Sequence, residues 1–105
     1  MVHMVATLDE FKQTLSSNEL VVVDFTASWC PPCQFIGPKF VELAGQTPAV
    51  TFIKVDVDEN GDTASHVGIS CMPTFMFYRG GQKVDELQGA DLNTLKAKVA
   101  ALQGK

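Results

Sequence analysis

Residues 21–33 read VVVDFTASWCPPC, and this stretch decides the fold. Together with Leu20 it opens as a run of β-branched and apolar residues, which is typical of a short strand buried on both faces of a sheet. It ends with Cys30 and Cys33, two cysteines separated only by prolines, directly before the apolar residues of a predicted helix. The cysteine pair therefore lies where a buried strand ends and a helix begins.

The elements predicted on either side alternate between strands and helices. Before the stretch, Val2–Val5 is expected to form a short edge strand, and a helix follows from Leu8. Thr7 and Glu10 match a capping box, in which the Thr7 hydroxyl accepts from the Glu10 amide and the Glu10 carboxylate reaches back. After it we expect a helix from Pro32 with a kink at Pro38, a strand at Thr51–Val57, a short helix at Asp62–Val67, a hairpin of Pro73–Tyr78 with Lys83–Leu87, and a helix capped by Asp91.

This order predicts an α/β fold with a mixed five-stranded sheet flanked by four helices. Strands that alternate with helices need parallel crossovers, whereas the hairpin adds an antiparallel edge. In such sheets the chemistry lies beyond the carboxyl ends of the strands. The cysteine pair is predicted at that place.

Size and charge limit the function classes. The chain has 105 residues, which fits a single domain over residues 1–105, and 46% of them are hydrophobic, enough for one core. A formal net charge of −4 argues against a nucleic-acid partner. No apolar run is long enough to span a bilayer, and the N-terminus has no basic region followed by an apolar stretch. We expect a cytoplasmic protein in a reducing compartment.

The three cysteines allow several interpretations of their function. An odd count argues against a secreted, disulfide-stapled scaffold. A zinc site needs four ligands, and the positions of Cys71, His3 and His66 do not have the spacing of zinc ligands. A structural disulfide between Cys30 and Cys33 would close so short a loop that it would constrain the unfolded chain little. Both are less favoured than a reversible dithiol couple, in which Cys30 at a helix N-cap attacks a disulfide and Cys33, about one turn further, resolves it.

Four motifs resemble the thioredoxin family in order and spacing, over nearly the whole chain. They are VVVDFTASWC (Val21–Cys30), FIKVDVDE (Phe52–Glu59), MPTFMF (Met72–Phe77) and LQGAD (Leu87–Asp91). The resemblance is to the cytosolic eukaryotic type, with WCPPC in place of the usual WCGPC. DFTASWC and MPTFMF are similar to plant members and Cys71 before Met-Pro to animal ones, so the lineage stays open. The family implies the thioredoxin fold.

The resemblance assigns roles to the residues around the pair. Cys30 would be the nucleophile and Cys33 the resolving thiol. Asp24 lies among apolar neighbours, where burial raises a carboxyl pKa, and the family places it behind the cysteines as a proton-transfer group. The alternative is a structural carboxylate satisfied by hydrogen bonds. Lys54 would lie near Asp24 in a secondary role and oppose this rise; the alternative is a solvated lysine.

The family's substrate groove maps onto three segments. Trp29, with Pro31 and Pro32, would form the flat apolar surface around the cysteines, whereas the alternative for Trp29 is core filling. The other segments would be the cis-proline loop Met72, Pro73 and Thr74, and the pair Gly89 and Ala90. Cys71 adjoins this surface, either as an inert, partly buried thiol or as an exposed thiol that forms dimers of an otherwise monomeric protein on oxidation.

Pro31 is the departure from the family pattern. It has no amide, so one donor near the Cys30 sulfur is lost, leaving the amides of Cys33 and Gln34. A lost donor would make the protein more reducing, whereas the added stiffness favours whichever redox state it fits. The sign of the net change in redox potential stays open.

The resemblance implies a protein-disulfide reductase that binds no cofactor and no metal. Its electrons would come from NADPH through a flavoprotein thioredoxin reductase, and its clients would include peroxiredoxins. One alternative is an oxidoreductase of the tryparedoxin or nucleoredoxin kind, which shares WCPPC but has a longer domain and a different electron donor. A folding oxidase or isomerase, or a redox-dependent binding module without turnover, are the others.

Overall fold

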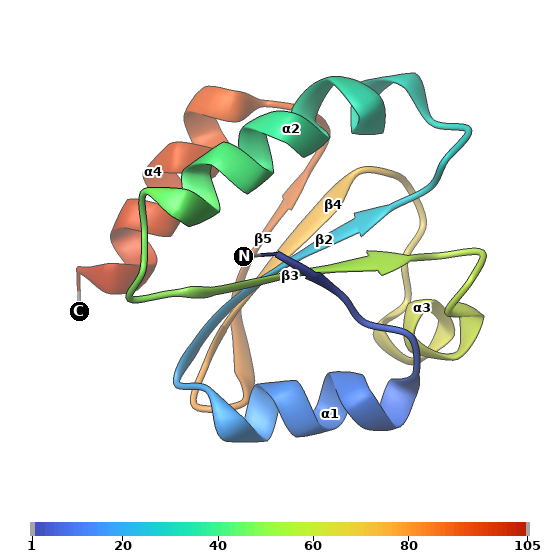
Figure 1. Cartoon of the computed structure of the whole chain (residues 1–105), viewed down its shortest axis with the longest axis horizontal. Coiled ribbons are helices and arrows are strands. Elements are labelled where there is room, and N and C mark those ends of the chain that lie inside the picture. The colour runs from blue at the N-terminus through green and yellow to red at the C-terminus, as the bar shows by residue number, and fades with distance from the viewer. Residues whose placement is uncertain (1, 105) are drawn as a thin grey trace.

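A computed structural model of the chain describes residues 2–104, so the first and last positions of the expected 1–105 domain lie outside the described residues. Elements alternate as the sequence predicts (Figure 1). In chain order they are β1 (His3–Met4), α1 (Leu8–Ser17), β2 (Leu20–Thr26), α2 (Pro31–Gly45), β3 (Thr51–Asp56), α3 (Gly61–Val67), β4 (Thr74–Arg79), β5 (Gln82–Gln88) and α4 (Leu92–Gln103).

The strands form one mixed sheet in the order β1-β3-β2-β4-β5. β3 runs parallel to β1 and β2, whereas β4 runs antiparallel to both β2 and β5. Figure 1 shows α2 and α4 on one face of the sheet and α1 and α3 on the other. The predicted α/β architecture, a five-stranded mixed sheet with four helices, is confirmed.

Each face of the sheet has its own hydrophobic core because side chains alternate along a strand. In β2, Val22 faces the cluster under α2 and α4, which contains Phe40 and Phe75. Val23 points the other way, into the cluster with Phe11. The buried residues of this strand, 21–25, are therefore all apolar except Asp24.

The structure tests two predictions about helix starts, and one of them is wrong. Helix α2 begins at Pro31 rather than Pro32, because the Gln34 amide donates to the Cys30 carbonyl oxygen at 3.1 Å and closes the first turn around Pro31. Proline suits this first helical position since its φ is already helical. The pairing predicted for Thr7 and Glu10 is confirmed: Thr7 accepts from the Glu10 amide at 3.1 Å, and the Glu10 carboxylate reaches back to accept from the Ala6 amide at 2.9 Å, one residue before the cap.

Strand boundaries differ from the predictions by one or two residues. The edge strand is confined to His3–Met4, and β3 ends at Asp56 instead of Val57. Between residues 2 and 104 no helix has the length and apolar character needed to cross a membrane.

Candidate active site

The cysteine pair forms a disulfide at the junction of β2 and α2, with 5.2 Å between the Cα atoms of Cys30 and Cys33. Cys30 is the N-cap of α2, and its sulfur accepts a hydrogen bond from the Cys33 amide at 3.2 Å. Both cysteines are largely buried, at 4% and 3% exposure. The pair therefore lies where the helix dipole and a backbone amide favour negative charge on the first sulfur.

The first turn of α2 leaves one donor for that sulfur. Pro31 and Pro32 have no amide hydrogen, the Cys33 amide bonds the Cys30 sulfur, and the Gln34 amide bonds the Cys30 carbonyl oxygen. The expectation that both remaining amides serve the sulfur is right for Cys33 and wrong for Gln34. The Gln34 amide instead makes a backbone hydrogen bond of the first helical turn, to the Cys30 carbonyl oxygen.

Asp24 is buried in β2, at 1% exposure, and neither carboxylate oxygen has a hydrogen-bond partner among residues 2–104. Burial raises the pKa of Asp24 to about 7, although the nearby Lys54 charge acts in the opposite direction. Asp24 pairs in register with Lys54 across β2 and β3. The contacts therefore do not support the alternative of a carboxylate satisfied by hydrogen bonds.

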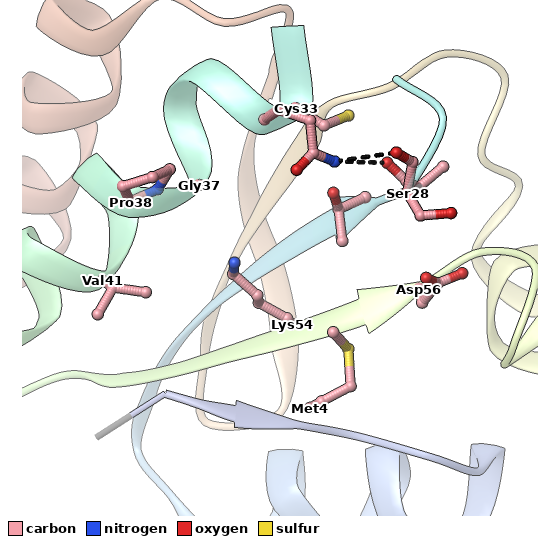
Figure 2. A pocket seen from close by; sticks show the side chains of 11 residues that line it. Met4, Ser28, Cys33, Gly37, Pro38, Val41, Lys54 and Asp56 are labelled. Atoms are coloured by element: carbon pink, nitrogen blue, oxygen red, sulfur yellow. Dashed lines mark hydrogen bonds between the residues drawn. The ribbon is translucent and has the colours of Figure 1, made fainter. Parts of the chain in front are cut away.

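Lys54 is half-buried and points from β3 toward α2 (Figure 2). A Cβ added to Gly37 of α2 would lie 3.3 Å from the Lys54 Nζ, so glycine leaves room for the ammonium group. Lys54 and Cys33 line one pocket of about 420 Å³, with Met4, Val41 and Asp56 on its other sides. Cys33 thus lines a pocket that is also lined by the positively charged Lys54.

Trp29 is 63% exposed, so the alternative that it fills the core is wrong. Its indole Nε1 donates to the Asp58 Oδ2 at 2.7 Å. Our sequence predictions omit Asp58 from the site. It lies two residues after the end of β3, at the same edge of the sheet as the cysteines, and that position was the available signal.

The two remaining groove segments lie side by side. The Met72–Pro73 peptide bond is cis, and the Gly89 amide donates to the Pro73 carbonyl oxygen at 2.9 Å. Met72 packs against the cluster formed by Ala27 and the two cysteines. The residues that follow Pro73 and Gly89 belong to the interior: Thr74 is buried, and Ala90 is partly buried and packs against the core. Met72, Pro73 and Gly89 therefore adjoin one another beside the disulfide.

Cys71 is a free, exposed cysteine whose sulfur lies 3.8 Å from the Thr74 hydroxyl. Its exposure contradicts the alternative of a partly buried thiol. For metals, residues 2–104 contain no group of three or more histidine, cysteine or acidic side chains that could hold an ion.

Comparison with known proteins places this geometry in a family. The thioredoxin family model matches residues 2–101. The chain is 50% identical to a thioredoxin of Ictalurus punctatus over 103 residues, covering 94% of this chain and 96% of the relative.

Solved structures agree with this match. Fasciola hepatica thioredoxin superposes with a TM-score of 0.94 at 38% identity, over 96% of this chain and 99% of that one. A chain from a yeast structure of thiol resolution in a mitochondrial 1-Cys peroxiredoxin via glutathione/thioredoxin systems gives a TM-score of 0.91 at 32% identity, covering 95% and 94%. The chain belongs to the thioredoxin family, and it is a thiol-disulfide oxidoreductase, a protein-disulfide reductase whose redox-active pair is Cys30–Cys33.

Proposed function

We propose that the chain is a single-domain thioredoxin of the cytosolic eukaryotic type in which Cys30 attacks and Cys33 resolves. The observation that carries this assignment is the hydrogen bond from the Cys33 amide to the Cys30 sulfur at the helix N-cap. The same donor and the helix dipole would stabilise a Cys30 thiolate in the reduced protein. Cys33 lies inside α2 and does not occupy a helix N-cap, so its sulfur lacks this stabilisation.

The reaction proceeds in two exchanges. The Cys30 thiolate attacks one sulfur of a client disulfide, which forms a mixed disulfide and releases one client thiolate. Cys33 then loses its proton and attacks the Cys30 sulfur, which releases the second client thiol and forms the Cys30–Cys33 disulfide. Two electrons pass to the client in each cycle.

Asp24 is the group proposed to accept the Cys33 proton. A carboxyl with a pKa of about 7 is half-ionised near neutral pH and can both take and return a proton. Cys33 and Lys54 line one pocket, Asp24 is not among its lining residues, and the proton would pass from Cys33 to Asp24 through a water molecule between them. Lys54 has the secondary role of limiting how far burial raises the pKa of Asp24.

The client is proposed to bind across the three groove segments. Trp29, Pro31 and Pro32 are exposed next to the disulfide and present an apolar surface. An extended client segment would pair with the backbone of Met72 beside the cis-proline loop of Pro73 and Thr74. Small residues at Gly89 and Ala90 would allow its backbone to approach closely.

Electrons are proposed to come from NADPH through a thioredoxin reductase, and peroxiredoxins are proposed as clients. The yeast peroxiredoxin structure among the solved relatives supports this client class. We place the protein in the cytoplasm as a monomer. Immunolocalisation tests the compartment, since the yeast relative belongs to a mitochondrial system and a mitochondrial signal would overturn the placement.

Insulin reduction with NADPH and thioredoxin reductase tests the proposal. Fast NADPH oxidation that is lost in Cys30→Ser supports the reductase. Absence of turnover in the wild type would leave a redox-dependent binding module, and turnover only with a glutathione- or trypanothione-type donor would favour the tryparedoxin-like alternative. Oxidation of reduced clients in preference to insulin reduction would favour a folding oxidase.

A further inference from the structure

The loop that carries Trp29, residues 27–29, joins β2 to α2 and belongs to neither. The Gln34 side chain reaches this loop from α2. Its Nε2 donates to the carbonyl oxygens of Ala27 at 3.3 Å and Ser28 at 3.2 Å, which are the dashed lines beside Ser28 in Figure 2. A third hydrogen bond to the loop, from the Cys30 amide to the Ala27 carbonyl oxygen, is 3.3 Å long.

We propose that Gln34 is a positioning residue for disulfide exchange: its side-chain amide fastens the loop of residues 27–29 to α2 and so sets where Trp29 lies beside the cysteine pair. The proposal rests on the protein-disulfide reductase activity. It adds a residue whose side chain bonds the loop backbone and acts on the reaction through Trp29.

The chemistry of the tie needs a donor and no acceptor. Two carbonyl oxygens of consecutive residues converge on one nitrogen, and the glutamine amide has two hydrogens on that nitrogen. Gln34 directly follows Cys33 in the chain, so the tie connects the loop to the same helical turn as the second sulfur. A shift of the loop would therefore move Trp29 relative to the pair.

Trp29 has its other anchor on the opposite side. Its indole nitrogen bonds Asp58 in the turn after β3, and the ring is otherwise largely exposed. The Gln34 side chain thus adds two hydrogen bonds to the one between Cys30 and Ala27 on the α2 side, and Asp58 holds Trp29 on the side of the turn. Few apolar contacts of the exposed indole can compensate if the Gln34 tie is lost.

Redox state changes how much this tie matters. In the oxidised protein the disulfide adds a second covalent link between Cys30, at the end of the loop, and α2, beyond the peptide bond to Pro31. Reduction removes that second link, so the position of the loop on α2 then rests on the chain itself and on hydrogen bonds from the first turn, those of Gln34 among them. Gln34 is therefore most important in the reduced protein, which is the form that attacks clients.

The test compares two substitutions in the full chain. Gln34→Met keeps the shape without a donor or a charge, whereas Gln34→Lys restores donors. Gln13→Ala, at an exposed glutamine of α1, is the control. Acrylamide quenching of the only tryptophan reports on Trp29, and stopped-flow mixing with oxidised insulin gives the rate of disulfide reduction.

In the reduced protein, Gln34→Met is expected to increase quenching of Trp29 about twofold and to slow insulin reduction about three- to tenfold, as expected for two modest hydrogen bonds. The increase in quenching should be smaller in the oxidised form. Gln34→Lys and Gln13→Ala should stay near the wild type.

Wild-type quenching and rate in Gln34→Met would overturn the proposal, as would equal losses in both Gln34 variants. A lower free energy of unfolding with an unchanged rate would also overturn it, since the role would then be structural. If the wild type failed to reduce insulin, the reductase activity would fail, and the quenching comparison would still test the tie.

Discussion

Asp24 combines full burial with the absence of any hydrogen-bond partner among the described residues. A carboxyl in that position costs stability when it is ionised, because nothing in the core replaces its hydration. The pKa of Asp24 is therefore raised to about 7 from its ordinary value of 3.8. Between about pH 4 and pH 7 the folded protein binds more protons than the unfolded chain, so its free energy of unfolding falls as pH rises through this window and levels off above it.

Replacement of this carboxyl should stabilise the fold and slow the reaction. At pH 8 we expect the free energy of unfolding of Asp24→Asn to be about 2 kcal/mol higher than that of the wild type. The substitution removes about 4 kcal/mol of cost for ionising the buried carboxyl, and the unpaired amide of the new asparagine offsets part of this gain. The gain should shrink toward pH 4. With the proposed proton acceptor removed, client reduction should slow about tenfold, which is less than is typical for a general base because solvent can also accept the Cys33 proton.

Urea unfolding at several pH values and stopped-flow insulin reduction check both effects. Asp62→Asn, at an exposed position of α3, serves as the matched control. A stability difference that stays constant from pH 4 to pH 8 would contradict the account of Asp24, and so would an unchanged rate of reduction.

At the scale of elements, the first turn of α2 explains what Pro31 contributes. A capping side chain accepts from the second or third amide of a helix, and here the Cys30 sulfur accepts from Cys33. An amide restored at residue 31 would lie too close in the chain to Cys30 to serve its sulfur. Pro31 therefore acts through stiffness rather than through a lost donor.

Substitution of Pro31 should accordingly reduce stability and leave thiol reactivity unchanged. We expect Pro31→Ala to lower the free energy of unfolding by about 0.5–1 kcal/mol and Pro31→Gly to lower it further, because both free the unfolded chain. Alkylation of the reduced protein by iodoacetamide should change less than about twofold in rate, since no donor to the sulfur is gained. An equal, large change in alkylation in both variants would show that the amide matters.

The groove wall at Gly89 depends on backbone conformation. Gly89 has a φ of 100°, and its amide bonds the Pro73 carbonyl oxygen. Gly89→Ala should destabilise the protein by about 1–2 kcal/mol although nothing lies within 4 Å of the added Cβ, since the cost comes from the backbone alone. Gly45→Ala in α2 meets equally open space without a positive φ, and should be neutral or slightly stabilising. Equal shifts in the urea midpoints of both variants would contradict this reasoning.

For the whole molecule, the exposed Cys71 predicts a second redox response. Oxidation of two copies by diamide would join their Cys71 thiols in an intermolecular disulfide. Non-reducing electrophoresis should show a dimer of the wild type that disappears with dithiothreitol and does not form in Cys71→Ser. A dimer that persists in Cys71→Ser would exclude this thiol.

The fold could be predicted from the sequence because its signals are local. The apolar run of β2, the Asp91 cap of α4 and the hairpin of β4 and β5 each depend on neighbouring residues. The start of α2 differs from the prediction because a proline disfavours the helical region for the residue before it, and at Pro31 the hydrogen bond from the Gln34 amide to the Cys30 carbonyl oxygen outweighs that preference.

The site was predictable where the chemistry of a residue identifies it, as for the cysteines and Asp24. Asp58 and the side chain of Gln34 were missed because their hydrogen bonds depend on the path of two loops. Trp29 and Asp58 are 29 positions apart, and no local pattern links them. Such contacts require the three-dimensional structure.

The most direct test of the central assignment is to trap the mixed disulfide. In a Cys71→Ser background, reduced Cys33→Ser is mixed with an oxidised peroxiredoxin and reduced Cys30→Ser is treated identically. Peptide mass spectrometry should find a covalent complex through Cys30 in the first protein and little or none in the second. A complex that forms through Cys33 in Cys30→Ser, and not through Cys30, would contradict the assignment of Cys30 as the attacking thiol.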